Sequence, residues 1–108
     1  MPALSICVKL GFVIRSFADK LTADLFYGEP TARARRVPEN VRRTALRKLT
    51  QLDAAVYLGD LHVPPGNRLE ALVGTRRGCH SLRVNDQWRI VFRWQDDGAH
   101  DVEFTDYH

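Results

Sequence analysis

The spacing of apolar residues changes near Asn67, and this change constrains the fold more than any other feature of the chain. Before Asn67, apolar residues recur every three or four positions, which is the spacing of one helical face. After it, apolar and polar residues alternate, as in a strand with one buried side. The sequence therefore predicts an α+β domain in which helices precede a sheet.

The alternating half of the chain consists of four short runs separated by three turns. The runs cover residues 68–73, 80–85, 88–94 and 101–105, and the turns read GTRRG, VNDQ and QDDGAH. Turns this short join neighbouring strands, so the pattern predicts a four-stranded antiparallel meander. One face of that sheet is apolar and is expected to pack on a helix; in its first strand this face would carry Leu69, Ala71 and Val73.

The first half predicts a leading strand and two helices. Residues 13–17 alternate weakly and predict the strand, after which Ser16 is expected to cap a first helix that ends at Gly28. A basic connector, TARARRV, leads to Pro38, which suits a first helical position because it has no N–H to leave unpaired. The second helix is the longer one, with an apolar stripe formed by Val41, Ala45, Leu49, Leu52 and Val56.

The positive charge of the chain is concentrated in one segment. The formal net charge is only +3, yet thirteen of the sixteen cations are Arg, whose planar fork pairs well with phosphate or carboxylate. This segment is either a solvated helix face or a docking surface for RNA or an acidic protein segment. It sets seven cations against a single acid, Glu39: Arg33, Arg35, Arg36, Arg42, Arg43, Arg47 and Lys48.

The cysteines and the apolar start of the chain bear on where the protein works. Cys7 and Cys79 have neither metal-binding nor redox spacing, and two cysteines do not make a disulfide scaffold. Residues 1–14 are apolar, but they are too short to span a bilayer and are interrupted by Lys9. The sequence therefore predicts a soluble, reduced, cytoplasmic protein with no membrane partner.

The chain ends with three chemically capable residues side by side, Asp106, Tyr107 and His108. An imidazole exchanges a proton near neutral pH, a phenol donates a proton or stacks on a base, and a carboxylate accepts a proton or orients a donor. The last strand alternates up to Phe104, so ladder bonds are expected to hold this end at the rim of the sheet. The plain alternative is a solvated terminal triplet.

The polar face of the predicted sheet offers further candidates. Arg83 and Arg89 are suited to neutralising charge on a phosphate, whereas Arg93 is more simply a solubilising residue. Glu70 is either a general base or the cross-strand partner of one of these arginines. We find no metal-ligand spacing, phosphate-cradling glycine loop or nucleophile elbow, so no metal and no other cofactor is predicted.

The remaining aromatic and histidine side chains are assigned to structure. Trp88 and Trp94 fall on the apolar face by their spacing, which favours core packing over base stacking. His62 is expected to be a loop residue, and His80 to be partly buried beside Leu82.

Several motifs, taken in this order, resemble the HigB-like toxins of the RelE/ParE superfamily, the "killer protein" group of type II toxin–antitoxin modules. They are PPGNRLEAL, then GTRRG, then SLRVNDQWRIVF, then a chain ending in DYH. The similarity runs from about Val13 to His108. It implies that residues 1–12 are an N-terminal extension, that 13–108 form a single toxin domain, and that Val13 is the native start.

The resemblance implies a ribosome-dependent mRNA endonuclease in which a ribose 2′-OH attacks the adjacent phosphorus. Carried over by position, Arg89 matches the family's phosphate-contacting arginine, and Asp106, Tyr107 and His108 match its terminal catalytic triplet. The implied partners are the ribosome, mRNA and a HigA-like helix-turn-helix antitoxin, with promoter DNA contacted only through that antitoxin. Alternatives are a ParE-like toxin that binds gyrase and cuts nothing, and a non-catalytic interaction module.

The chain departs from this pattern in one strand. Some relatives carry His and Lys where this sequence has Glu70 and Val73. The absence of that Lys from this chain removes a cation near the scissile phosphate. Arg68, Arg76 or Arg83 is a candidate to replace that cation, and Glu70 is retained as a candidate catalytic residue. The helix arginines Arg42, Arg43 and Arg47 are candidates for binding RNA or the ribosome.

Overall fold

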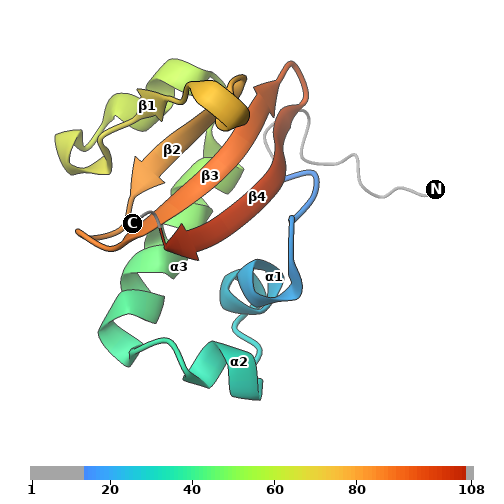
Figure 1. The fold of residues 1–108 in the computed structure, drawn as a ribbon, viewed down its shortest axis with the longest axis vertical. Coiled ribbons are helices and arrows are strands. Elements are labelled where there is room, and N and C mark those ends of the chain that lie inside the picture. The colour runs from blue at the N-terminus through green and yellow to red at the C-terminus, as the bar shows by residue number, and fades with distance from the viewer. Residues whose placement is uncertain (1–13, 107–108) are drawn as a thin grey trace.

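The computed structural model describes residues 14–106, which form a layer of helices against an antiparallel sheet (Figure 1). Within this range, no helix is long and apolar enough to cross a membrane. The elements in chain order are α1 (Lys20–Tyr27), α2 (Ala32–Arg35), α3 (Glu39–Ala54), the 3-10 helices η2 (Leu58–His62) and η3 (Pro65–Asn67), β1 (Glu70–Ala71), the 3-10 helix η4 (Gly74–Arg76), β2 (Cys79–Arg83), β3 (Trp88–Gln95) and β4 (Gly98–Asp106).

The sheet has the order β1-β2-β3-β4 with every pair antiparallel, so the predicted meander and the α+β class are confirmed. Its regular pairing is interrupted once, by a bulge between Val91 and Arg93 of β3 and the facing part of β4. In Figure 1, α3 lies behind the sheet, and α1 and α2 lie together below β4.

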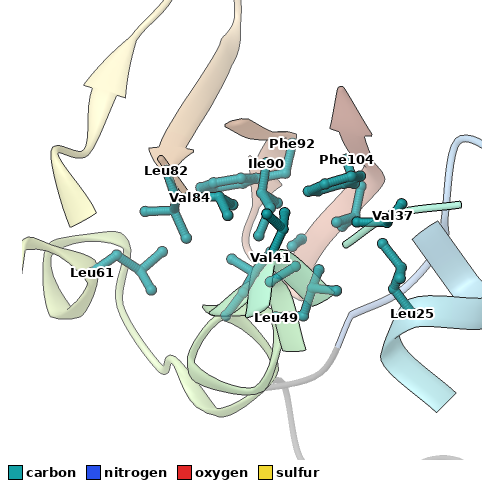
Figure 2. Packing of buried hydrophobic residues seen from close by; sticks show 14 of the residues in the cluster. Leu25, Val37, Val41, Leu49, Leu61, Leu82, Val84, Ile90, Phe92 and Phe104 are labelled. Atoms are coloured by element: carbon teal, nitrogen blue, oxygen red, sulfur yellow. The ribbon is translucent and has the colours of Figure 1, made fainter. Parts of the chain in front are cut away.

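The core lies between α3 and one face of the sheet (Figure 2). Alternate residues of β3, Ile90 and Phe92, are fully buried against Leu49 of α3, because a strand turns every second side chain to the same face. Four members of the predicted α3 stripe are buried: Val41, Ala45, Leu49 and Leu52. Trp88 and Trp94 pack against this core, as predicted, and Trp88 stacks on Phe104 with ring centroids 4.5 Å apart.

The fifth predicted member of the α3 stripe, Val56, is not in the core, and the residue is 54% exposed. The helix ends at Ala54 because Asp60 captures the next amides: Val56 N and Tyr57 N each donate a hydrogen bond to its Oδ2, at 3.0 Å. These bonds turn the chain into η2, so the helix ends two residues before Val56 and does not carry that side chain onto the buried face.

The first strand is shorter than its sequence pattern predicts. Only Glu70 and Ala71 pair regularly with β2, and the prediction that Ala71 and Val73 face the core is wrong, since both are exposed. Leu72 is buried instead and donates its amide to Cys79 O at 2.9 Å. Gly74, with a left-handed φ of 70°, then turns the chain into η4, so the alternation has no room to continue.

The leading segment pairs with β4 without forming a regular strand. Ile14 and Phe17 make isolated parallel bridges to Ala99 and Val102. Ser16 does not cap α1; its Oγ accepts the amide of Asp101 at 2.8 Å. The cap is Asp19, whose Oδ1 accepts the amide of Thr22 at 2.9 Å.

The predicted basic connector contains a helical turn of its own, α2, capped by Thr31. Its Ala34 is buried, and Val37 immediately after it is also in the core. The end of α1 is as predicted: Gly28 takes the left-handed conformation that terminates many helices.

A buried polar cluster holds the η2–η3 loop against α3. Lys48 of α3, only 5% exposed, donates to Asn67 Oδ1, and Asn67 Nδ2 donates to Leu61 O and Val63 O at 3.1 and 3.2 Å. Burial lowers the pKa of Lys48. Because Asn67 is fully buried, these bonds fix the chain just before it enters β1.

Candidate functional site

The sheet face turned away from α3 carries four of the predicted site residues, and we call it the open face; the four are Glu70, Arg76, Arg83 and Arg89. Cross-strand register arranges it in rows. One row is Arg83, Arg89 and Thr105; the next is Glu70, Ser81, Val91 and Glu103; the third contains Cys79, Arg93 and His100.

Arg83 and Arg89 are direct cross-strand partners on the open face. Their side chains are 30% and 17% exposed, so both are held in place by the surrounding protein. Arg83 pairs with Asp86 at 2.5 Å. Each arginine has a carboxylate neighbour, Asp86 for Arg83 and Glu70 for Arg89, and two guanidinium groups on adjacent strands can also bind one anion. This pair is therefore a candidate phosphate-binding position.

Glu70 lies in the next row and makes the cross-strand contact that was one of its two predicted roles. Its Oε1 lies 3.8 Å from Arg89 Nη1, and its carboxylate is 49% exposed. At this distance the pair is an ion pair without a tight hydrogen bond. Glu70 is thus placed both to orient Arg89 and to accept a proton from a group bound beside it.

The side chain of Arg76, at the end of η4, reaches across the open face to β4. Its Nη1 donates to Glu103 Oε1 at 2.9 Å, which links the segment after β1 to β4 across two intervening strands. Beneath this level, Ser81 and Val91 are almost completely buried, although they belong to the open face. The centre of the open face is consequently covered, and the Arg83–Arg89 row lies to one side of it.

Asp106 lies at the end of β4, opposite Trp88 in register. Alternation puts it on the side of Phe104, whereas Thr105 is the residue that faces Arg89. The carboxylate of Asp106 accepts a hydrogen bond from Gln87 Nε2 at 3.0 Å. The structure therefore brings Asp106 to the sheet rim, as expected, on the other face from Arg89. Tyr107 and His108 lie outside the described residues.

The other candidate arginines are distributed over two regions. Arg68 is exposed and ends η3 with a left-handed φ of 46°. Arg42, Arg43 and Arg47 lie on α3, on the far side of the sheet from the open face. The structure does not gather these residues into one surface with Arg83 and Arg89.

His80 is partly buried, as predicted, and lies beside Phe92 with ring centroids 6.1 Å apart. His62, predicted to be a loop residue, is instead the exposed last residue of the 3-10 helix η2. Burial lowers the pKa of His80. A third, His100, contacts Asp97 Oδ1 through Nε2 at 2.6 Å, and this hydrogen bond lowers the pKa of Asp97. Among residues 14–106, no three His, Cys, Asp or Glu side chains gather as a metal-ligand set.

Sequence reasoning did not single out three partners of the predicted residues: Gln87, Glu103 and Thr105. The alternation of the last strand does place Glu103 and Thr105 on the polar face. Their pairing with Arg76 and Arg89 depends on strand register and on the path of η4, neither of which the apolar pattern specifies.

Comparison with known proteins agrees with this architecture. The family model described as "RelE-like toxin of type II toxin-antitoxin system HigB" matches residues 15–108. Toxin HigB-1 of Vibrio cholerae serotype O1 is 45% identical over 83 residues, covering 77% of this chain and 85% of that protein. An uncharacterized protein of Haemophilus influenzae is 30% identical over 73 residues, covering 68% of this chain and 71% of its own length.

Endoribonuclease HigB of Proteus vulgaris is 33% identical over 61 residues, covering 56% of this chain and 65% of that protein. The family match spans nearly all of the described residues and includes the whole helix–sheet unit. The chain therefore belongs to the HigB family of RelE-like toxins from type II toxin–antitoxin systems.

Proposed function

We propose that this toxin is an endoribonuclease that cleaves mRNA on the ribosome and is neutralised by a HigA-like helix-turn-helix antitoxin. The observation that supports it best is the Arg83–Arg89 row, in which two arginines are cross-strand partners on the open face with side chains 30% and 17% exposed. Fixed cations of this kind stabilise a phosphate as it gains negative charge in a transition state. A relative named Endoribonuclease HigB supports the same reaction class.

The proposed reaction is an intramolecular transfer at phosphorus. A ribose 2′-OH loses its proton to a base and attacks the adjacent phosphorus, and the 5′-oxygen takes a proton from an acid and leaves. Arg89 and Arg83 balance the charge on the non-bridging oxygens. Glu70 and His108 are the proposed proton-transfer groups, and Tyr107 is proposed to stack on a base or to transfer a proton. Asp106, predicted as a third proton-transfer group, is given no step in this reaction because it lies on the other sheet face from Arg89.

Glu70 is the candidate base that the described residues support most directly. It is half-exposed and lies on the same face as Arg89. An ionised carboxylate beside the phosphate site can accept the 2′-OH proton, and the neighbouring Arg89 offsets its repulsion from the phosphate. Arg68 and Arg76 are proposed to contact neighbouring phosphates, and the site of action would be the cytoplasm, where ribosomes translate.

The first experiment maps transcript 5′ ends after induction of the toxin. We expect new ends inside translated frames, and we expect His108→Ala or Arg89→Ala to reduce their number about a hundredfold or more, because acid–base and charge-stabilising groups contribute on this scale. The matched control is Arg93→Ala, an exposed arginine on the same strand and face that pairs with Asp101. This control should cleave normally.

Three outcomes would contradict the proposal in different ways. Full cleavage by both variants would exclude the assigned residues. Growth arrest without new 5′ ends would indicate a gyrase-directed toxin instead. Equal cleavage of purified transcripts without ribosomes would refute the ribosome requirement alone.

A further inference from the structure

Arginines of the open face are paired with carboxylates of the same chain. A polyanion is attracted by net positive charge, so these carboxylates make the face less attractive to RNA than its arginines alone would be. The pairs are Arg76–Glu103 at 2.9 Å, Arg83–Asp86 at 2.5 Å, Arg93–Asp101 at 3.6 Å and Arg89–Glu70 at 3.8 Å.

The Arg76–Glu103 pair joins two segments that lie 27 positions apart in the chain. Arg76 is the last residue of η4, and Glu103 lies in β4, on the far side of β2 and β3. Arg76 Nη1 donates to Glu103 Oε1 at 2.9 Å, which is the distance of a good hydrogen bond. In the free toxin, Glu103 therefore occupies Arg76.

The pair is exposed enough for an outside anion to compete for Arg76. The side chains of Arg76 and Glu103 are 44% and 27% exposed. An ion pair in contact with solvent is weak, and its paired state is favoured by roughly fivefold at most. A phosphate offers a guanidinium the same two-oxygen acceptor as a carboxylate. A phosphate that reaches this part of the open face can consequently replace Glu103 on Arg76.

We propose that Glu103 is an intramolecular competitor of RNA, which holds Arg76 in the free toxin and is displaced when a phosphate binds there. The inference rests on the proposed function, in which Arg76 contacts an RNA phosphate. Glu103 then lowers the affinity of the open face for every RNA. Free strands bind weakly as a result, whereas RNA held on the ribosome meets the site at a high effective concentration.

The test measures RNA binding by the full toxin through fluorescence anisotropy. The probe is a fluorescein-labelled single-stranded RNA of mixed sequence whose 2′-hydroxyls are methylated, so it lacks the attacking group and stays intact. Glu103→Gln keeps the size of the side chain and removes its charge. Because this change releases Arg76, we expect it to tighten RNA binding about three- to fivefold.

Asp101→Asn is the matched control. It removes the same charge from the same strand and releases Arg93, which is not proposed to contact RNA. Asp101 has a left-handed φ of 53°, a conformation that asparagine tolerates, so this variant should fold. Its RNA affinity should change less than about twofold, because an exposed ion pair away from the RNA contributes little.

Removing Glu103 also removes its repulsion of the RNA backbone, and a double-mutant cycle with Arg76→Ala separates the two effects. Without Arg76 there is nothing to compete for, and only the repulsion is left. The tightening caused by Glu103→Gln should therefore be at least about twofold larger in the unmodified toxin than in the Arg76→Ala background.

Equal tightening in the two backgrounds would overturn the proposal, and so would equal effects of Glu103→Gln and Asp101→Asn, since charge alone would then explain the change. Weakened binding by Arg89→Ala together with no effect of Glu103→Gln would refute the competition and leave the proposed function standing. Unchanged RNA affinity in both of these variants would overturn RNA binding by the open face as well.

Discussion

His80 faces the core side of β2, with its ring stacked beside Phe92. Its Nδ1 is buried without a hydrogen-bond partner among the described residues. Burial disfavours the imidazolium form, which lowers the pKa of His80 in the folded state. The unfolded chain keeps the ordinary value of about 6.5, so it binds a proton at a pH where the folded chain does not.

This difference predicts an acid-sensitive part of the stability. The contribution is fully present above about pH 6.5 and is lost as the pH falls toward the lower pKa of the folded state. We expect His80→Phe, which retains an aromatic ring beside Phe92, to show a smaller loss of unfolding free energy between pH 7.5 and 5 (about the range in which a histidine titrates) than the unmodified chain. Urea denaturation at both pH values measures it.

The exposed His62 supplies the control for this experiment. His62→Phe removes one titrating imidazole from the chain, as His80→Phe does, but the imidazole that it removes is exposed. A pH dependence that changes equally in the two variants would show that burial of His80 is not the cause.

At the scale of single elements, α1 tests how a local cap is chosen. Asp19 accepts hydrogen bonds from the amide and the hydroxyl of Thr22. Ser16, three residues earlier, instead accepts a hydrogen bond from the amide of Asp101 in β4. We expect Asp19→Ala to lower the unfolding free energy by about 1 kcal/mol, the usual value of such a cap, and Asp19→Asn to keep most of it. Thermal or urea denaturation of the three proteins decides this. Equal destabilisation by Ala and Asn would point to the charge of Asp19 and not to capping.

The same elements show what the sequence could predict. The α3 stripe and the strands β2 to β4 were predictable because long amphipathic helices and repeated alternation between short turns are strong local signals. Val56 and Val73 were assigned wrongly because the structure that displaces them is not periodic. The Asp60 side chain accepts a hydrogen bond from Val56 N just after the end of α3, and Gly74, in the left-handed conformation, ends the first strand.

The candidate site was predictable as a list of residues and less so as a geometry. The arginines of the polar face followed from alternation, but the pairing of Arg83 with Arg89 required the register of the β2–β3 hairpin. The position of Asp106 across the sheet from Arg89 follows from the register of β3 with β4. Register is set by turn geometry and packing over the whole sheet, so the pattern of one strand does not determine it.

At the scale of the whole molecule, cationic side chains lie on two sides of the sheet. The Arg83–Arg89 row faces one way, and the arginines of α2 and α3 lie on the helical side. If the first group binds RNA phosphates, the affinity for ribosomes should fall steeply between about 50 and 200 mM salt.

Each phosphate contact removed should make that dependence shallower by about 0.7–0.9 in the slope of log affinity against log salt. Arg89→Ala is therefore expected to reduce the slope by about this amount, and Arg93→Ala to leave it unchanged. Ribosome pelleting over a salt series measures the slope. An affinity that does not respond to salt would contradict phosphate binding by the open face.

The outer margin of β4 is occupied by the protein's own chain. Asp101 N and Val102 N donate to Ser16, and Phe104 N donates to Thr22 Oγ1 at 2.8 Å. At the opposite margin, β1 offers only two paired residues. Among residues 14–106, few sheet-edge backbone groups therefore remain for strand addition by another molecule, or for sheet-to-sheet growth into aggregates. We expect a partner of this sheet to recognise its side chains.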